Sequence, residues 1–174
     1  MRTTRGTLRV FTYRQGILAR AGHDLALELG RFDVHLADMR VQVGCELTSL
    51  SVLGAVEGGR IAEDALSPDQ KADIVTNLRE RVLSVQRFPI CRFEGELAVE
   101  GARYLASGEL LLRGQRRPLG IEAKLEAGKL VGQVELTPSQ WGIAPFKALL
   151  GAIRLQDRVL VRFELPAPET WDAG

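Results

Sequence analysis

The chain has 174 residues, about the length of a single domain, and 45% of them are hydrophobic, enough for a sizeable core. Its 23 Lys and Arg nearly balance its 22 Asp and Glu, which argues against nucleic acid or an anionic membrane as a partner. Two cysteines are too few for a disulfide framework. No long apolar segment follows the basic N-terminus or reaches the length of a membrane span. We therefore expect a soluble cytoplasmic protein with reduced thiols and no stable membrane insertion.

The first part of the chain predicts strands. Residues 7–13 are rich in β-forming residues, and residues 23–36 and 39–47 alternate between apolar and polar side chains. A period of two residues is typical of a strand that buries one face. We predict a strand in each of these three segments.

Residues 67–83 have the period of a helix instead. Ser67 is a suitable N-cap, Pro68 suits the first helical position, and Gln70 completes a capping box. Apolar residues recur along one side of this helix at Ile74, Leu78 and Val82, with Val75 alongside. Pro89 prevents the helix from continuing, and an alternating segment begins directly after it. We predict one helix inserted between strands of a single sheet.

The second half alternates more regularly than the first, and glycine-containing turns separate its segments. Successive strands joined by short turns are typical of an antiparallel meander. The apolar stretch 145–152 predicts a second short helix or turn. The predicted strands occupy residues 90–101, 104–114, 119–127, 128–136 and 158–166.

Many strands, one inserted helix and no β-α-β alternation predict an all-β sandwich or barrel. Closure into a barrel removes exposed edge strands, and about eight strands leave room for side chains or one small ligand. We expect a single domain over residues 1–165. A tail over residues 166–174 is rich in Pro and small polar residues, which suggests loosely held chain.

The sequence holds no recognisable catalytic motif and indicates no cofactor. His23 and Asp24 are adjacent, and a carboxylate can orient an imidazole. A zinc site could draw on His23, His35, Cys45 and Cys91, but their spacing matches no known pattern. Trp141 could line a pocket or close the barrel end as a structural plug.

Small residues in the predicted strands favour an internal cavity, because small inward side chains leave volume unless large ones oppose them. The residues concerned are Ala98, Ala106, Gly108, Ala123 and Gly132.

Four segments carry a resemblance to a known family. They are the helix end, Phe-Pro and long strand of residues 83–93, the hairpin of residues 105–119, the Ser-Gln-Trp-Gly-Ile segment at 139–143, and the His-containing turn at 22–25. In this order, over roughly residues 8–165, they resemble the YceI-like family. The family's G-N-x-x-R-D-x-H-L approach to the helix is absent. The resemblance implies a lipocalin-like antiparallel β-barrel that can enclose a polyisoprenoid chain.

The leading hypothesis is a non-enzymatic binding or carrier protein that encloses an apolar lipid-like ligand, a polyisoprenoid or a fatty-acyl chain. Two alternatives stay open. The first is a non-enzymatic interaction or structural module with a filled barrel core, and such a module could form a homodimer. The second is an enzyme or metal site at His23, assisted by Asp24. Strand alternation and the resemblance name the candidate ligand-binding residues as Phe93, Leu97, Leu110, Leu112, Ile121, Val134, Trp141, Phe146, Val161, Phe163 and His23.

Overall fold

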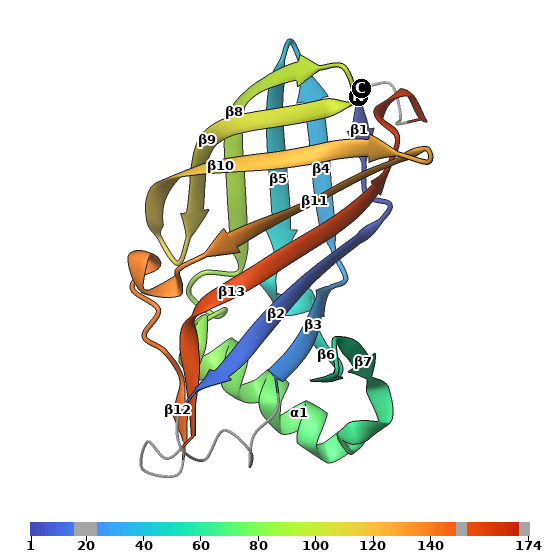
Figure 1. The fold of residues 1–174 in the computed structure, drawn as a ribbon. Coiled ribbons are helices and arrows are strands. Elements are labelled where there is room, and N and C mark those ends of the chain that lie inside the picture. The colour runs from blue at the N-terminus through green and yellow to red at the C-terminus, as the bar shows by residue number, and fades with distance from the viewer. Residues whose placement is uncertain (16–23, 149–152, 171–174) are drawn as a thin grey trace.

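One antiparallel sheet curls around a common interior, and a helix lies against its lower end (Figure 1). The computed structural model describes residues 1–15, 24–148 and 153–170. The sheet is built from β1 (Arg2–Thr3), β2 (Thr7–Gln15), β3 (Asp24–Leu29), β4 (Phe32–Ala37), β5 (Arg40–Glu46), β6 (Leu50–Glu57), β7 (Arg60–Ala62), β8 (Ile90–Glu100), β9 (Arg103–Leu112), β10 (Gln115–Glu126), β11 (Lys129–Leu136), β12 (Lys147–Ala148) and β13 (Ile153–Pro166). The predicted all-β class and antiparallel barrel are confirmed.

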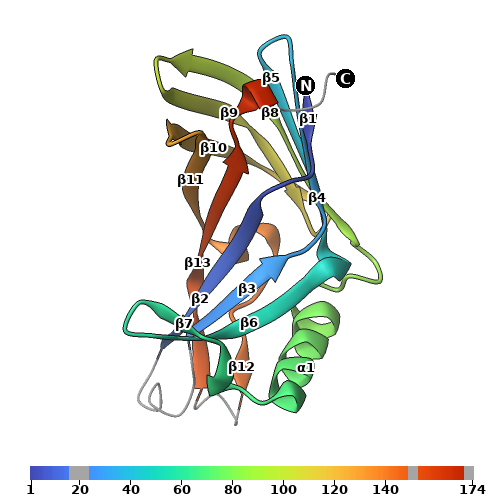
Figure 2. The ribbon, with the colours of Figure 1, turned by 90° about the vertical axis from the view of Figure 1, so that its right-hand side faces the viewer.

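The barrel closes through two long bent strands. Along the sheet the order is β1-β4-β5-β8-β9-β10-β11-β13-β2-β3-β6-β7, with β12 paired to β13. β3 runs directly into β4, and β5 runs into β6 through a 3₁₀ turn at Leu47–Ser49. Hydrogen bonds from Glu46 N to Arg31 O (3.0 Å) and from Gly30 N to Ser49 O (3.3 Å) bridge the two bends. Figure 2 shows the upper pair β4–β5 and the lower pair β3–β6 lying one above the other.

The described residues form thirteen strands, where the sequence predicted about eight. The difference arises because the two long strands are each interrupted at a bend, and because β1, β7 and β12 are short additions. The alternation changes phase at each bend, from odd to even positions between Leu29 and Phe32 and between Leu47 and Leu50. The sequence prediction treated each segment as one strand and did not use this change of phase.

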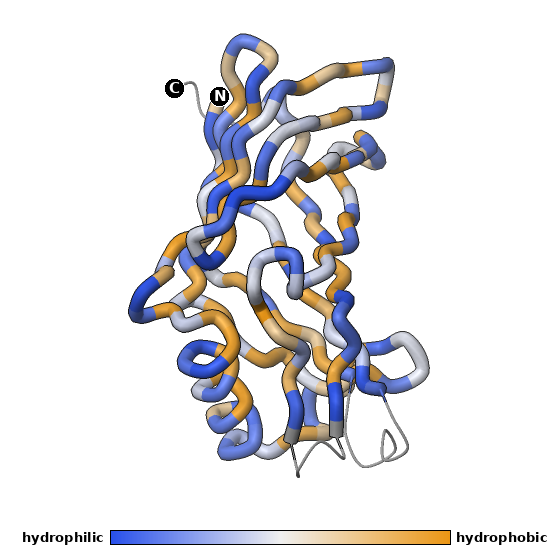
Figure 3. Tube along the Cα trace, turned by 90° about the vertical axis from the view of Figure 1, so that its left-hand side faces the viewer, coloured by the Kyte–Doolittle hydropathy of each residue, from blue (hydrophilic) through white to orange (hydrophobic). Residues whose placement is uncertain are grey.

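The predicted helix is confirmed as α1 (Pro68–Asn77), which continues as a π-helical turn at Leu78–Val82. Ser67 Oγ accepts from Gln70 N (3.2 Å), and the Gln70 side chain accepts from Ser67 N (2.8 Å), which completes the capping box. β8 starts at Ile90, directly after Pro89. Figure 3 shows the hydrophobic side of α1 turned toward the barrel.

The short helix predicted at 145–152 is wrong where the structure describes the chain. Lys147 and Ala148 form β12 and pair with Arg154 and Ile153 of β13. An isolated helix of this length is marginal in water, whereas β13 offers a ladder of hydrogen bonds. Residues 149–152 lie outside the described residues.

The start of the predicted tail is packed rather than loose. β13 extends to Pro166, and a 3₁₀ turn follows at Pro168–Thr170. Ala167 is buried and its N–H donates to Gly128 O (3.1 Å), while Arg5 donates to Thr170 O (2.6 Å). Backbone pairing with neighbouring turns holds this segment, which composition alone does not reveal.

Candidate functional site: an apolar cavity inside the barrel

The barrel encloses a cavity of about 300 Å³. Its lining side chains come from β2 to β6, β8 to β11 and β13, together with the end of the helical segment and residues 138–146. Among the described residues, every lining residue is apolar except Thr12, Tyr104, Gln156 and Asp157, which carry polar groups, and Cys45 and Cys91, which carry thiols. Such a cavity accommodates an apolar ligand without leaving many buried polar groups unpaired.

Strand alternation places most of the predicted ligand-binding residues in the cavity wall. Lining residues recur at every second position along most of the strands. Figure 3 shows the hydropathy alternating along the chain. The predicted residues that line the cavity are Phe93, Leu97, Leu110, Leu112, Ile121, Val134, Phe146, Val161 and Phe163.

Trp141 does not line the cavity. Its side chain is only 2% exposed, and its indole Nε1 donates to the carbonyl of Leu110 at 3.0 Å. A 3₁₀ turn at Pro138–Trp141 holds it against the barrel wall. Of the two roles considered, the geometry supports the structural plug.

His23 lies outside the described residues. Its neighbour Asp24 accepts a hydrogen bond from Arg14 N (2.8 Å) and lies 3.7 Å from the Arg14 guanidinium. The carboxylate of Asp24, at the start of β3, is therefore already paired with Arg14 of β2.

The four zinc candidates are not brought together in the part of the chain that is described. Cys45 and Cys91 are directly opposite each other on β5 and β8, and both line the cavity. His35 lies on β4 between the buried Val34 and Leu36, and alternation turns it to the opposite face of the sheet. Across residues 1–15, 24–148 and 153–170, no three His, Cys, Asp or Glu side chains cluster closely enough to hold a metal ion.

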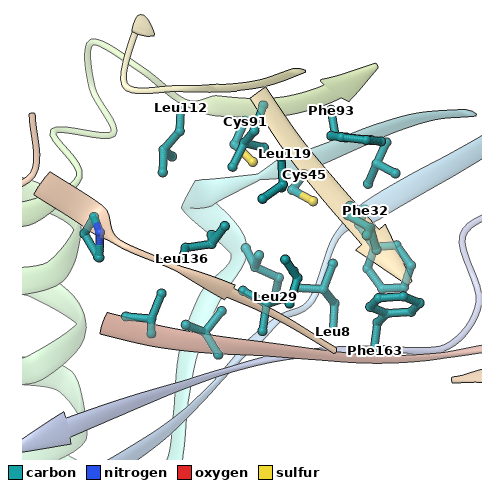
Figure 4. Close-up of a pocket in the computed structure, with 18 of the residues that line it drawn as sticks. Leu8, Leu29, Phe32, Cys45, Cys91, Phe93, Leu112, Leu119, Leu136 and Phe163 are labelled. Atoms are coloured by element: carbon teal, nitrogen blue, oxygen red, sulfur yellow. The ribbon is translucent and has the colours of Figure 1, made fainter. Parts of the chain in front are cut away.

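Cys45 and Cys91 lie in the cavity wall (Figure 4), and their thiols interact with each other. A hydrogen bond with Cys91 and then burial raise the pKa of the Cys45 thiol well above its ordinary value. Both cysteines are free thiols. They add soft, weakly polar surface to an otherwise aliphatic wall.

Phenylalanines form one end of the cavity. Figure 4 shows the side chains of Phe32, Phe93 and Phe163 on the same side of the view, away from Leu112 and Leu136. The Phe163 ring lies over Gly132 of the neighbouring strand, where a Cβ atom would overlap the ring. Gly132 therefore makes room for an aromatic side chain rather than leaving an empty space.

The other small residues contribute unequally to the cavity. Ala106 and Ala123 are buried in its wall, whereas Ala98 is exposed on the outer face of β8. The inference from small residues to a cavity therefore applies only to those whose strand position points inward.

The predicted set left out many lining residues, including the inward residues of β2 to β6, and two further groups show why. Leu78, Val82 and Leu83 line the cavity from the helical segment, and the apolar stripe on that helix was the signal that could have found them. Thr12, Gln156 and Asp157 form a polar part of the wall. Thr12 follows Leu8 and Val10 at the period of two, whereas the adjacent Gln156 and Asp157 depend on an irregularity in the pairing of β13, for which the sequence carries no signal.

No helix in the described ranges has the length and apolar character needed to cross a lipid bilayer.

Comparison with known proteins identifies the family. A family model described as YceI-like domain matches residues 9–167. The chain belongs to the YceI-like family. No curated protein matches it.

Several solved structures share this fold at low sequence identity. BcnA of Burkholderia cenocepacia is 12% identical with a TM-score of 0.66, covering 95% of this chain and 99% of its own. A polyisoprenoid binding domain from Saccharophagus degradans, implicated in plant cell wall breakdown, is 12% identical with a TM-score of 0.59 and 95% coverage of both chains. The YceI protein of Campylobacter jejuni is 9% identical with a TM-score of 0.57, covering 81% of this chain and 82% of its own. At these identities the likeness establishes a common YceI-like fold.

Proposed function

We propose that this YceI-like protein is a binding or carrier protein that holds one apolar chain, an isoprenoid or fatty-acyl lipid, inside its barrel. The observation that carries the proposal is the cavity of about 300 Å³ with its almost entirely apolar wall. Transfer of apolar surface from water contributes roughly 25 cal/mol per Å², before the cost of ordering the ligand. The polyisoprenoid binding domain of Saccharophagus degradans, which has the same fold, supports this class of ligand.

The helix supports ligand binding better than partner binding. Its apolar stripe was the feature that favoured an interaction module. Leu78 and Val82 of that stripe line the cavity, and Arg79 donates to Leu50 O of β6 at 2.9 Å. The stripe is therefore used to close the barrel, and the proposal assigns binding without catalysis.

The test is mass spectrometry of an organic extract of the purified protein against a mock purification, combined with a cavity-filling variant. Ala106 is buried in the cavity wall on β9, so Ala106→Leu places extra side-chain volume where the ligand would lie. Ala98→Leu is the matched control, because Ala98 is exposed on the adjacent strand.

We expect a stoichiometric lipid in the wild type and in Ala98→Leu, and a much reduced amount in Ala106→Leu. An empty extract, together with no uptake of added farnesol by the wild type, would refute the proposal.

A further inference from the structure

The polar groups of the cavity wall gather beside one irregularity in the sheet. Leu155 of β13 pairs with Arg14, and Val159 pairs with Thr12, so residues 156–158 oppose only Tyr13 of β2. Extra residues of this kind form a bulge and redirect the side chains of the strand. Gln156 and Asp157 thereby line the cavity together with Thr12.

Thr12 provides an unpaired hydroxyl at this place. The residue is only 6% exposed, and its Oγ1 has no hydrogen-bond partner within the described ranges. Buried hydroxyls in proteins nearly always have a hydrogen-bond partner. An unpaired hydroxyl that faces a cavity therefore favours a ligand with a polar group that can hydrogen-bond to it.

The two neighbours on β13 have capacity left for a ligand. Gln156 Nε2 donates to Arg14 O (3.2 Å), and Asp157 Oδ1 accepts from Ser139 N (2.9 Å). In the part of the chain that the structure describes, these bonds use Gln156 Nε2 and Asp157 Oδ1, which leaves the Gln156 amide oxygen and Asp157 Oδ2 for a ligand. Both are acceptors, while the Thr12 hydroxyl can donate or accept.

The charge at this place selects against an anion. Asp157 is the one charged side chain among the described lining residues, and no Lys or Arg lines the cavity there. The nearest arginine on β13, Arg158, points away: it lies over the Tyr13 ring at 4.6 Å and pairs with Glu135 at 3.4 Å. A phosphate or carboxylate head group would meet a like charge with no lining cation to offset it.

The opposite end of the cavity suits a hydrocarbon tail. Val159, which pairs with Thr12, lies four residues before Phe163 on β13, a distance of about 13 Å along a strand. Phe163, Phe32 and Phe93 form the aromatic end (Figure 4). A ligand that spans the cavity can therefore place its head at Thr12 and its tail among these rings.

We infer that Thr12, Gln156 and Asp157 form a head-group subsite for an uncharged hydroxyl, so that the barrel selects a lipid alcohol over the corresponding phosphate ester. This inference rests on the proposed lipid-binding function and adds the polarity and orientation of the ligand. The ligand hydroxyl donates to the Asp157 carboxylate or the Gln156 amide oxygen and accepts from the Thr12 hydroxyl.

The test uses isothermal titration calorimetry to measure binding of three ligands that share one hydrocarbon tail and differ in the head group. They are farnesol, farnesyl methyl ether and farnesyl diphosphate. We expect farnesol to bind about tenfold or more tightly than the diphosphate, and several-fold more tightly than the ether, which cannot donate.

Two isosteric variants assign the effect to the subsite. Thr12→Val should weaken farnesol binding roughly three- to tenfold, whereas Thr7→Val, on the outward face of the same strand, should leave it unchanged. Asp157→Asn keeps the acceptor for Ser139 N and should reduce the discrimination against the diphosphate.

The outcomes separate the two proposals. If none of the three ligands binds, the alcohol subsite is refuted, and an empty organic extract of the same protein refutes the proposed function as well. If all three bind alike, or the diphosphate binds best, and Thr12→Val has no effect, the lipid carrier stands and the alcohol subsite is refuted. If Thr12→Val does not fold, the response of Asp157→Asn to the diphosphate still decides the inference.

Discussion

Replacement of Trp141 by Phe separates a structural role from a ligand-binding role. The substitution removes the indole N–H that donates to Leu110 O at 3.0 Å, inside a side chain that is 2% exposed. Loss of this buried hydrogen bond costs about 1 kcal/mol. Loss of part of the buried ring system costs about 1–2 kcal/mol more. We expect Trp141→Phe to destabilise the fold by about 2–3 kcal/mol.

For a chain of this size, that loss corresponds to a melting temperature lower by roughly 4–12 °C. The assay is thermal unfolding followed by circular dichroism, with farnesol affinity measured on the same samples below the transition. Affinity should stay close to that of the wild type, because Trp141 does not line the cavity.

Phe146→Leu is the matched control, since Phe146 lines the cavity and is only half-buried. It should weaken farnesol binding more than it lowers the melting temperature. An unchanged melting temperature with a large loss of affinity in Trp141→Phe would show that the indole contacts the ligand, and would refute the reasoning.

Two further predictions concern the barrel wall. Gly132→Ala should destabilise the protein by about 1–3 kcal/mol in urea unfolding, because the added Cβ overlaps the Phe163 ring; Gly120→Ala, which meets no atom within 4 Å, should be nearly neutral. Equal effects of the two substitutions would contradict the packing of Phe163. During alkylation by iodoacetamide, followed by peptide mass mapping, Cys91 should react before Cys45, because the hydrogen bond and burial raise the pKa of the Cys45 thiol. The reverse order would contradict the raised pKa of the Cys45 thiol.

Local chemistry was sufficient to predict the long helix, the main strands and part of the cavity wall. The Ser67 capping box and the Phe88-Pro89 boundary are short-range signals, so the helix and the strand after it could be read from a few neighbouring residues. Inward positions such as Phe93 and Val161 followed from the period of two, because successive strand residues point to opposite faces whatever their partners.

Features that depend on pairing between distant strands needed the tertiary structure. The sequence around Trp141 is equally compatible with a pocket-lining role and with a structural plug. Only the hydrogen bond from its indole to Leu110 O, which comes from a distant strand, distinguishes the two roles. The facing thiols of Cys45 and Cys91 depend on the register of β5 against β8. The placement of Gln156 and Asp157 beside Thr12 depends on a bulge in β13, which is a mismatch in length between two strands rather than a property of either sequence. Periodicity assigns the face of each residue, whereas register and closure assign its neighbours across the barrel.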